Sequence, residues 1–270
     1  MSSPTRRHAL VSLAFVLFAV LAPASTSAAT TYSTADISDA EQDALTLINR
    51  QRSDRDLVTL KWDPRVADLA RERATSMAAT GTFSHQEADG SDVFDRITAS
   101  GMTWYGAGEI IAWNNAEALD YSVAFAVQGW MRSSGHAAII LSRDYNYVSF
   151  GMAIGNDGKR YWAGIFLKGP DRTAAWAKVG TVAKRVIDSA TTKVYIRWAG
   201  RDTRLQVLTS GLRYYETARR IDGGEWVSYG TTTDTTATRY WRRGLTIEFR
   251  VRARDRAGNW SPWRSVEVNP

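Results

Sequence analysis

Two histidines and one glutamate are the side chains of this 270-residue chain whose types best suit metal binding or proton transfer. His85 and His136 lie in segments that interrupt helical patterns, and Glu109 precedes an apolar run that predicts a place at the rim of a core. Two imidazoles and a carboxylate can hold zinc or another divalent cation. A carboxylate near a bound water can also accept a proton, so Glu109 is the candidate general base.

Spacing alone leaves a second interpretation open. The three residues span 52 positions, so they share a site only if the fold brings them together. Otherwise each histidine caps or hydrogen-bonds a helix end, and Glu109 is a solvated loop acid. The chain has no cysteine, which excludes thiol catalysis, disulfide bonds and Cys-ligated metals. Serines lie beside both histidines, but no strand-turn-helix elbow is indicated that would present one as a nucleophile.

Residues 1–29 have the pattern of a secretory signal peptide. Arg6 and Arg7 precede an apolar run from Ala9 to Ala22, and small residues follow up to Ala29. The apolar run is shorter than the ~17 to 25 residues that a spanning helix needs. We therefore expect an extracellular protein, in part associated with the cell wall, that is not an integral membrane protein after cleavage.

The remaining chain divides into two halves of opposite charge. Residues 30–180 carry 15 basic and 19 acidic side chains, whereas residues 181–270 carry 17 basic and 9 acidic ones. The pattern predicts one domain over 30–172, a linker over 173–180 and a second domain over 181–270.

The first of these domains has a mixed α and β pattern, with helices before strands. The predicted features are a capping box at Ser38 and Glu41, a helix from Asp63-Pro64 to Gly81, a short helix around Val93 to Ile97, a helix from near Asn115 to Trp130, and a hairpin of 145–154 with 160–167.

The second domain changes to the period of two that is typical of strands. Apolar residues alternate from Val194 to Trp198 and again from Ile247 to Ala253. Turn signals separate these runs, so the pattern predicts an all-β sandwich.

An ordered series of short motifs runs from Ile37 to Leu167. The motifs are Asp39-Ala40-Glu41, Leu60-Lys61-Trp62-Asp63, Phe83-Ser84-His85, Asp89-Gly90, Gly108-Glu109-Ile110-Ile111-Ala112, Trp130 to His136, and Ser149-Phe150-Gly151-Met152. This series resembles the bacterial branch of the CAP superfamily, the group of cysteine-rich secretory proteins, antigen 5 and plant pathogenesis-related proteins. The resemblance implies an α-β-α sandwich whose cleft gathers two histidines and acidic residues and binds zinc or another divalent cation in some members.

Carried over by position, His85 and His136 match the two cleft histidines and Glu109 matches a cleft acid. The second acid of the eukaryotic pattern falls on Ser133, and a hydroxyl is a poor metal ligand at neutral pH. Two further departures remove polar partners that could orient the site, Ile110 and Ile139.

The last 90 residues resemble a fibronectin type III or related immunoglobulin-like domain, chiefly from Phe249 to Trp263. The functional interpretation is contact with an anionic wall polymer or carbohydrate through Arg250, Arg252 and Arg254, with Trp260 and Trp263 for stacking. Alternatively, the arginines are the solvated face of a strand and the tryptophans are core.

These patterns together predict a secreted, monomeric binding protein. Its cleft would take a divalent metal, a lipid or a wall ligand, and its basic sandwich would localise it. Two alternatives stay open, a metal-assisted extracellular hydrolase of peptide or cell-wall material and a purely structural adhesin. An extracellular destination argues against nucleic acid as the partner.

Overall fold

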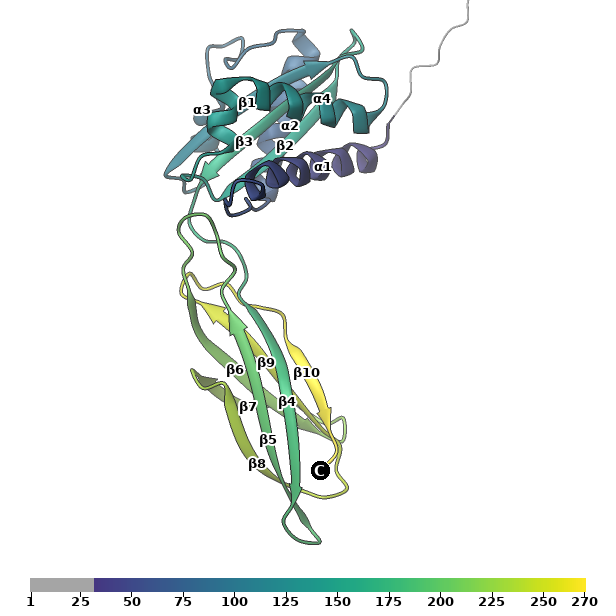
Figure 1. Ribbon diagram of the computed structural model, residues 1–270, viewed down its shortest axis with the longest axis vertical. Helices are drawn as coiled ribbons and strands as arrows, with labels where there is room; N and C mark the ends of the chain where they lie inside the picture. Colours follow the sequence, from purple (N-terminus) through teal and green to yellow (C-terminus); the bar gives the residue numbers. More distant parts are fainter. Residues whose placement is uncertain (1–31) are drawn as a thin grey trace, which may run out of the picture. The chain divides into compact units, whose positions relative to one another are not determined.

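The computed structural model describes residues 32–270, and the predicted signal peptide lies outside them (Figure 1). Its helices are α1 (Thr34–Ser53), α2 (Pro64–Thr80), α3 (Val93–Ala99), α4 (Leu119–Arg132) and α5 (Ser134–Ile140). Its strands are β1 (Gly106–Asn114), β2 (Tyr147–Ile154), β3 (Arg160–Lys168), β4 (Trp176–Val186), β5 (Thr191–Arg201), β6 (Leu212–Ile221), β7 (Val227–Thr232), β8 (Thr236–Arg242), β9 (Ile247–Asp255) and β10 (Arg264–Val268).

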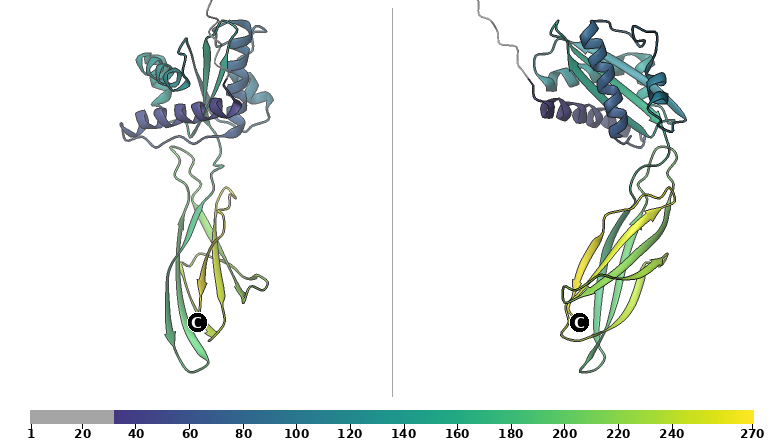
Figure 2. Two further views of the ribbon diagram at one scale, coloured as in Figure 1. Left: turned by 90° about the vertical axis from the view of Figure 1, so that its right-hand side faces the viewer. Right: turned by 180° about the vertical axis from the view of Figure 1, so that it is seen from behind.

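Helices cover both faces of the first sheet, which has the antiparallel order β1-β3-β2. Alternate strand residues face opposite sides. The pictures show α1 and α4 on one side of the sheet and α2 on the other (Figures 1 and 2). Phe150 and Phe166 pack with α1 and α4, whereas Tyr147 and Ile165 pack with α2 and α3. Because both faces are covered, β2 and β3 are buried along most of their length. This part of the chain is therefore a three-layer α-β-α arrangement.

Local signals place α2 as the sequence predicts. The Asp63 side chain accepts a hydrogen bond from Arg65 N at the N-terminus, and Gly81 ends the helix at φ 68°. At Gly151 the strand β2 approaches α2 so closely that an added Cβ would lie 2.2 Å from the Ala70 carbonyl carbon. The helix and sheet are thus held at contact distance through the backbone.

Three expectations for this half are wrong. The capping box at the start of α1 is formed by Ser33 and Asp36, while Glu41 is fully buried beside Arg71. A strand, β1, precedes α4, because the apolar run after Glu109 pairs with the central strand β3 at one edge of the sheet. His136 lies within the short helix α5 rather than in an interruption between helices.

The second half of the chain forms two antiparallel sheets, β10-β9-β6-β7 and β4-β5-β8. Inward residues of both sheets, including Trp198, Phe249 and Val251, build one apolar core. The alternation predicted for β9 is confirmed, since its odd-numbered residues are buried and its even-numbered ones are half-exposed.

The connection between the halves is short. Strand β4 begins at Trp176, inside the segment 173–180 that the sequence assigns to a linker, because Ala175 and Ala177 enter the second core. In the loop after β5, Leu205 joins the apolar cluster of Val66 and Leu69. None of the helices between residues 32 and 270 is both long and apolar enough to cross a bilayer.

Candidate functional site

The candidate acid Glu109 lies on the central part of β1, paired with Ile165 of β3. Its neighbour Ile110 points into the α1 and α4 core, so Glu109 points to the side of α2. Only 6% of Glu109 is exposed. A buried carboxylate needs a counter-charge and hydrogen-bond donors, so the solvated-loop alternative is wrong.

Arg73 of α2 supplies that counter-charge. Its Nε donates to Glu109 Oε1 at 2.8 Å, its Nη1 to Glu87 Oε1 at 2.5 Å, and its Nη2 to the Ser84 carbonyl at 2.8 Å. Arg73 itself is fully buried. Burial opposes its charge, but the two carboxylates more than offset this and raise the pKa of Arg73 above its usual value.

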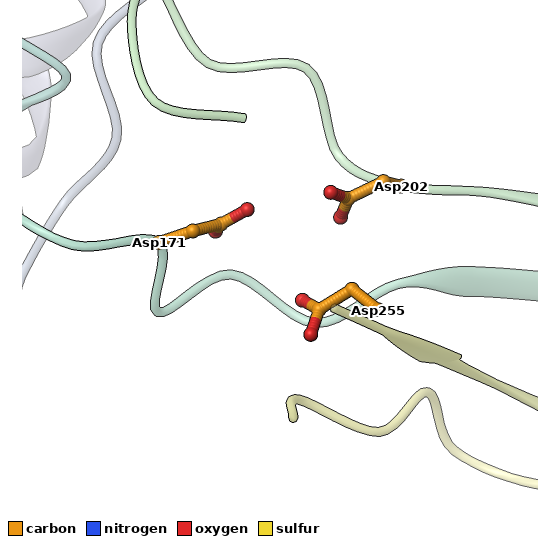
Figure 3. Close-up of side chains that lie close together, drawn as sticks. All are labelled: Asp171, Asp202 and Asp255. Atoms are coloured by element: carbon orange, nitrogen blue, oxygen red, sulfur yellow. The ribbon is translucent and has the colours of Figure 1, made fainter. Parts of the chain in front are cut away.

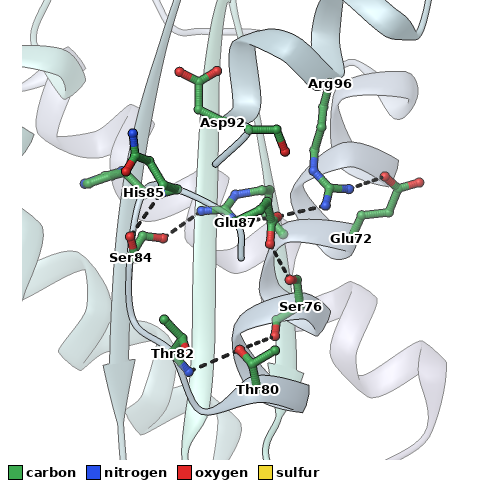
Figure 4. A network of polar contacts seen from close by, with 12 residues as sticks. Glu72, Ser76, Thr80, Thr82, Ser84, His85, Glu87, Asp92 and Arg96 are labelled. Carbon is green, nitrogen blue, oxygen red and sulfur yellow. Dashed lines mark hydrogen bonds and ion pairs between the residues drawn. The ribbon is translucent and has the colours of Figure 1, made fainter. Parts of the chain in front are cut away.

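Glu87 forms the outer part of this network (Figure 4). It accepts hydrogen bonds from Ser76 Oγ and from Arg96 Nη2, the latter at 2.8 Å, in addition to Arg73. Burial opposes its ionisation, yet the Ser76 hydroxyl and the Arg73 guanidinium lower the pKa of Glu87 overall. The segment from 81 to 92 is therefore tied to both α2 and α3.

Arg73 was not among the site residues expected from the sequence, although its position in α2 carries a signal. Arg73 falls on the apolar stripe of α2, between Ala70 and Met77, where a charged side chain must face the interior. The identity of its partners depends on long-range pairing and has no local signal.

His85 extends the chain of contacts to the surface. Its Nδ1 lies 2.7 Å from Glu109 Oε2, while 55% of its side chain is exposed. Because an ionised carboxylate only accepts, this contact assigns a proton to Nδ1, so that the neutral form of the ring has its lone pair on Nε2. Glu109 therefore has one oxygen on Arg73 and the other on His85.

His136 of α5 lies beside His85, with ring centroids 6.3 Å apart. Burial, and then the proximity of His85, lower the pKa of His136 below its usual value. Its imidazole is consequently neutral at neutral pH, the state in which it can ligate a metal. The two histidines that the sequence singles out thus do meet.

Ser133 does not join them through any observed hydrogen bond. It ends α4 and precedes α5, and its hydroxyl makes no capping hydrogen bond. A divalent cation fits the donor set best if His85 Nε2 and a His136 nitrogen bind it while Glu109 orients His85, the arrangement common around metal-bound histidines. Within residues 32–270, His85, Glu109 and His136 do not bring three ligand atoms within 4.8 Å of one another.

A cleft of about 720 Å³ opens beside His85 and Glu109. Its lining combines polar and apolar side chains from the 84–94 segment, β1 and the α5 region: Ser84, His85, Gln86, Asp92, Val93, Phe94, Ala107, Gly108, Glu109, Ile139 and Tyr145. Gly108 keeps it open, because an added Cβ would lie 3.0 Å from Tyr145 Oη and 3.2 Å from Ile139 Cγ2. No lysine or arginine is among these lining residues.

Away from this cleft, Asp171, Asp202 and Asp255 bring their carboxylates within 4.8 Å of one another (Figure 3). Backbone N–H groups of nearby turns bond all three residues, but Asp202 Oδ1 is buried without a hydrogen-bond partner. Burial, followed by repulsion from the other two carboxylates, raises the pKa of Asp202. The sequence gives no indication that these three residues meet, because they lie far apart along the chain.

Arginines and tryptophans interleave on the sheet that contains β9. The order of the stack is Trp226, Arg250, Trp263, Arg252, Trp260 and Arg254. Arg250 Cζ lies 3.8 and 4.1 Å from its two neighbouring ring centroids, within cation–π range. Arg252 also pairs with Glu216 at 2.6 Å. Both sequence interpretations are therefore incomplete, since these tryptophans are half-buried against the arginines.

Comparisons with known proteins place a family match on the first half. Residues 45–166 match the family model described as "CAP: Cysteine-rich secretory protein family". Two Bacillus subtilis proteins are similar, the uncharacterized membrane protein YlbC (29% identity over 128 residues) and the uncharacterized protein YkwD (27% over 122 residues). The matches cover 47% and 45% of this chain but only 34% and 46% of those relatives, so the chain spans less than half of each.

Two solved structures are similar over about half of the chain. One is an outer surface protein of Borrelia burgdorferi, with 19% identity, a TM-score of 0.45, and coverage of 50% of this chain and 96% of that one. The other is an extracellular protein from Bacillus anthracis that contains an SCP domain, with 23% identity, a TM-score of 0.44, and coverage of 52% and 45%.

Proposed function

We propose that the part of the chain matched by the CAP family model is the ligand-binding domain of an exported protein. Its site is the cleft lined by His85 and Glu109, together with His136 beside His85, and its ligand is a divalent cation together with an uncharged wall or lipid group. The observation that carries the proposal is the buried chain of contacts from Arg73 through Glu109 to His85. That chain holds a surface imidazole in a single orientation beside a second, neutral one.

Zinc is the cation that this donor set suits best. Two neutral imidazoles are good zinc ligands, and a bound zinc would offer open positions for an oxygen ligand. Glu109 supports His85 from behind rather than serving as the third ligand, because both its oxygens already accept hydrogen bonds. The sequence pattern suggests Glu109 as a metal ligand or general base, and the role proposed here is instead to orient His85.

An uncharged partner suits the rest of the cleft. No lysine or arginine lines it, so apart from the bound cation no side chain there would compensate a phosphate or carboxylate. Apolar side chains such as Phe94 and Ile139 offer contact area to an apolar or sugar surface.

Binding is favoured over hydrolysis by the state of Glu109. A general base must present a free oxygen to the water that it activates. In this site one carboxylate oxygen is held by Arg73 and the other by His85. The hydrolase alternative would require water to reach a remaining lone pair of Glu109, of which only 6% is exposed.

For the second half we propose an immunoglobulin-like sandwich that retains the protein at the anionic cell wall. Its net charge of +8 favours such a polymer. If so, retention of the protein on isolated wall material falls steeply as salt is raised, because exposed charges are screened. Retention that does not change with salt would contradict this localisation.

The cleft proposal is tested by isothermal titration with zinc near pH 7 and about two units lower, because imidazoles titrate near pH ~6.5. The mature protein is compared with the His85→Ala, His136→Ala double variant. We expect one site that is lost in the variant and greatly weakened at the lower pH. Binding that the folded double variant retains would refute the proposal.

A further inference from the structure

One buried side chain of α2 links β1 to the segment from 81 to 92 that contains His85. Arg73 donates three hydrogen bonds to three different groups, on β1, at Ser84 and at Glu87. Ser84 is the residue before His85, and Glu109 is the group that holds the His85 ring. The Arg73 guanidinium therefore holds both the backbone carbonyl of the residue before His85 and the carboxylate that bonds the His85 ring.

The second carboxylate in this network anchors the wall of the cleft. Glu87 is bonded by Ser76, Arg73 and Arg96, and its backbone N–H donates to the Ser91 carbonyl at 2.8 Å. The segment from 84 to 92 contributes four of the cleft-lining residues. Releasing Glu87 would remove the contacts of that segment with Ser76 and Arg96, and would leave the bond from Arg73 to the Ser84 carbonyl as a remaining tie to α2.

We propose that Arg73 is a positioning residue of the cleft and that Glu87 is its anchor on the 81–92 segment. Arg73 fixes the Glu109 carboxylate so that His85 carries its proton on Nδ1 and presents the lone pair of Nε2 to the ligand. This inference rests on the proposed function, because the positioning of His85 serves ligand binding. The contacts of Arg73 themselves are those of the ligand-free protein.

A lysine cannot replace this arginine. Its single ammonium lacks the planar fork that reaches Glu109, Glu87 and the Ser84 carbonyl at once. The substitution Arg73→Lys keeps the positive charge, so it separates the loss of geometry from the loss of charge.

The test is the ¹⁵N spectrum of the histidine rings at one fixed pH near 8, recorded without metal. In the unmodified protein we expect His85 as a single tautomer protonated at Nδ1. In Arg73→Lys we expect mixed tautomers of His85 in the same spectrum. In a separate zinc titration we expect its affinity to be at least tenfold lower, the loss typical when the hydrogen-bond partner of a metal-binding histidine is removed. The matched control is Arg71→Lys. Arg71 lies on α2, as Arg73 does, and bonds the buried carboxylate of Glu41, so this variant alters a similar contact and should leave the His85 signals unchanged.

A second variant keeps the proposal open to refutation if Arg73→Lys does not fold. Glu87→Gln removes one charge from the anchor and should accelerate hydrogen exchange of the backbone amide at residue 87 at least tenfold. Glu72→Gln, which alters only the exposed partner of Arg96, should not. A folded Arg73→Lys variant with an unchanged His85 tautomer, or a Glu87→Gln variant with unchanged exchange, would overturn the inference. Absence of zinc binding in the unmodified protein would instead refute the proposed function and leave the tautomer result standing.

Discussion

Glu109 illustrates how a residue's partners decide its chemistry. As a free acid beside two histidines it would be a ligand or a base. Buried between Arg73 and His85, it becomes the group that sets the orientation of an imidazole. The distinction matters because a ligand and an orienting group respond differently to the same substitution.

The substitution Glu109→Gln is expected to weaken zinc binding about 10- to 100-fold. Its amide can still accept from Arg73, but the amide nitrogen would then face His85 Nδ1 as a donor. That reverses the tautomer and puts the proton on Nε2. Isothermal titration gives the affinity, and a change of less than twofold would show that Glu109 does not orient His85.

Asp202 gives a test that depends on pH. Its pKa is raised in the folded protein by burial and by Asp171 and Asp255, so the native state binds the proton more tightly than the unfolded state does. Stability is therefore lost as pH rises from the unfolded pKa through the folded one.

Asp202→Asn removes that repulsion, and its amide can donate to the neighbouring carboxylates. We expect a gain of about 1 kcal/mol at pH 7, in the range of relieving one unsatisfied buried polar group. Denaturant unfolding at pH 7 and at pH 3 measures it, because the gain should vanish once both states are protonated. An equal gain at both pH values would point to packing instead.

At the scale of elements, the approach of α2 to β2 depends on Gly151. A methyl group there would overlap the backbone between Ala70 and Arg71, which cannot yield as a flexible side chain can. Gly151→Ala should therefore cost about 3 kcal/mol or more, comparable with other overpacked core sites. Gly129→Ala in α4 is the control: nothing lies within 4 Å, and the change should be neutral or stabilising in thermal unfolding. Similar melting temperatures for the two variants would contradict the close contact.

The stacked arginines and tryptophans of the second half should contribute to stability. Trp263 lies between Arg250 and Arg252 at 4.1 and 4.5 Å, so Trp263→Ala removes two cation–π contacts and half-buried ring surface. We expect a loss of about 1 to 2 kcal/mol in urea unfolding. Trp176 is more exposed, and its two neighbouring cations lie 5.6 and 5.9 Å from its ring centroid. Trp176→Ala should therefore lower the free energy of unfolding by less than about 0.5 kcal/mol. Equal losses would show that the stack adds nothing.

Elements whose ends are marked locally could be predicted from the sequence. The cap at Asp63 and the glycine at 81 define α2, and the turn from Gly155 to Gly158 defines the hairpin of β2 and β3. Strand β1 could not, because a strand buried on both faces lacks alternation and its glycines weaken the strand signal. The start of α1 was misplaced because Ser38 and Glu41 also have the spacing of a capping box.

At the scale of the whole molecule, the resemblance to CAP proteins predicts that His85, Glu109 and His136 lie close together, and the structure has His85 bonded to Glu109 and beside His136. Spacing alone could not, because the three come from a loop, a strand and a helix that only the packed sheet brings together. Arg73 and Glu87 were missed for the same reason, since their importance arises from ion pairs between distant segments.

If His85 and His136 bind one cation together, with Glu109 behind His85, both imidazoles must respond to zinc at once. This is measured by a zinc titration of the protein without its predicted signal peptide, followed by the ¹⁵N signals of both histidine rings near pH 7. We expect His85 Nε2 and one nitrogen of His136 to shift together and reach saturation at one equivalent, while His85 Nδ1 stays protonated. Shifts of only one ring, or loss of the Nδ1 proton to the metal, would contradict it.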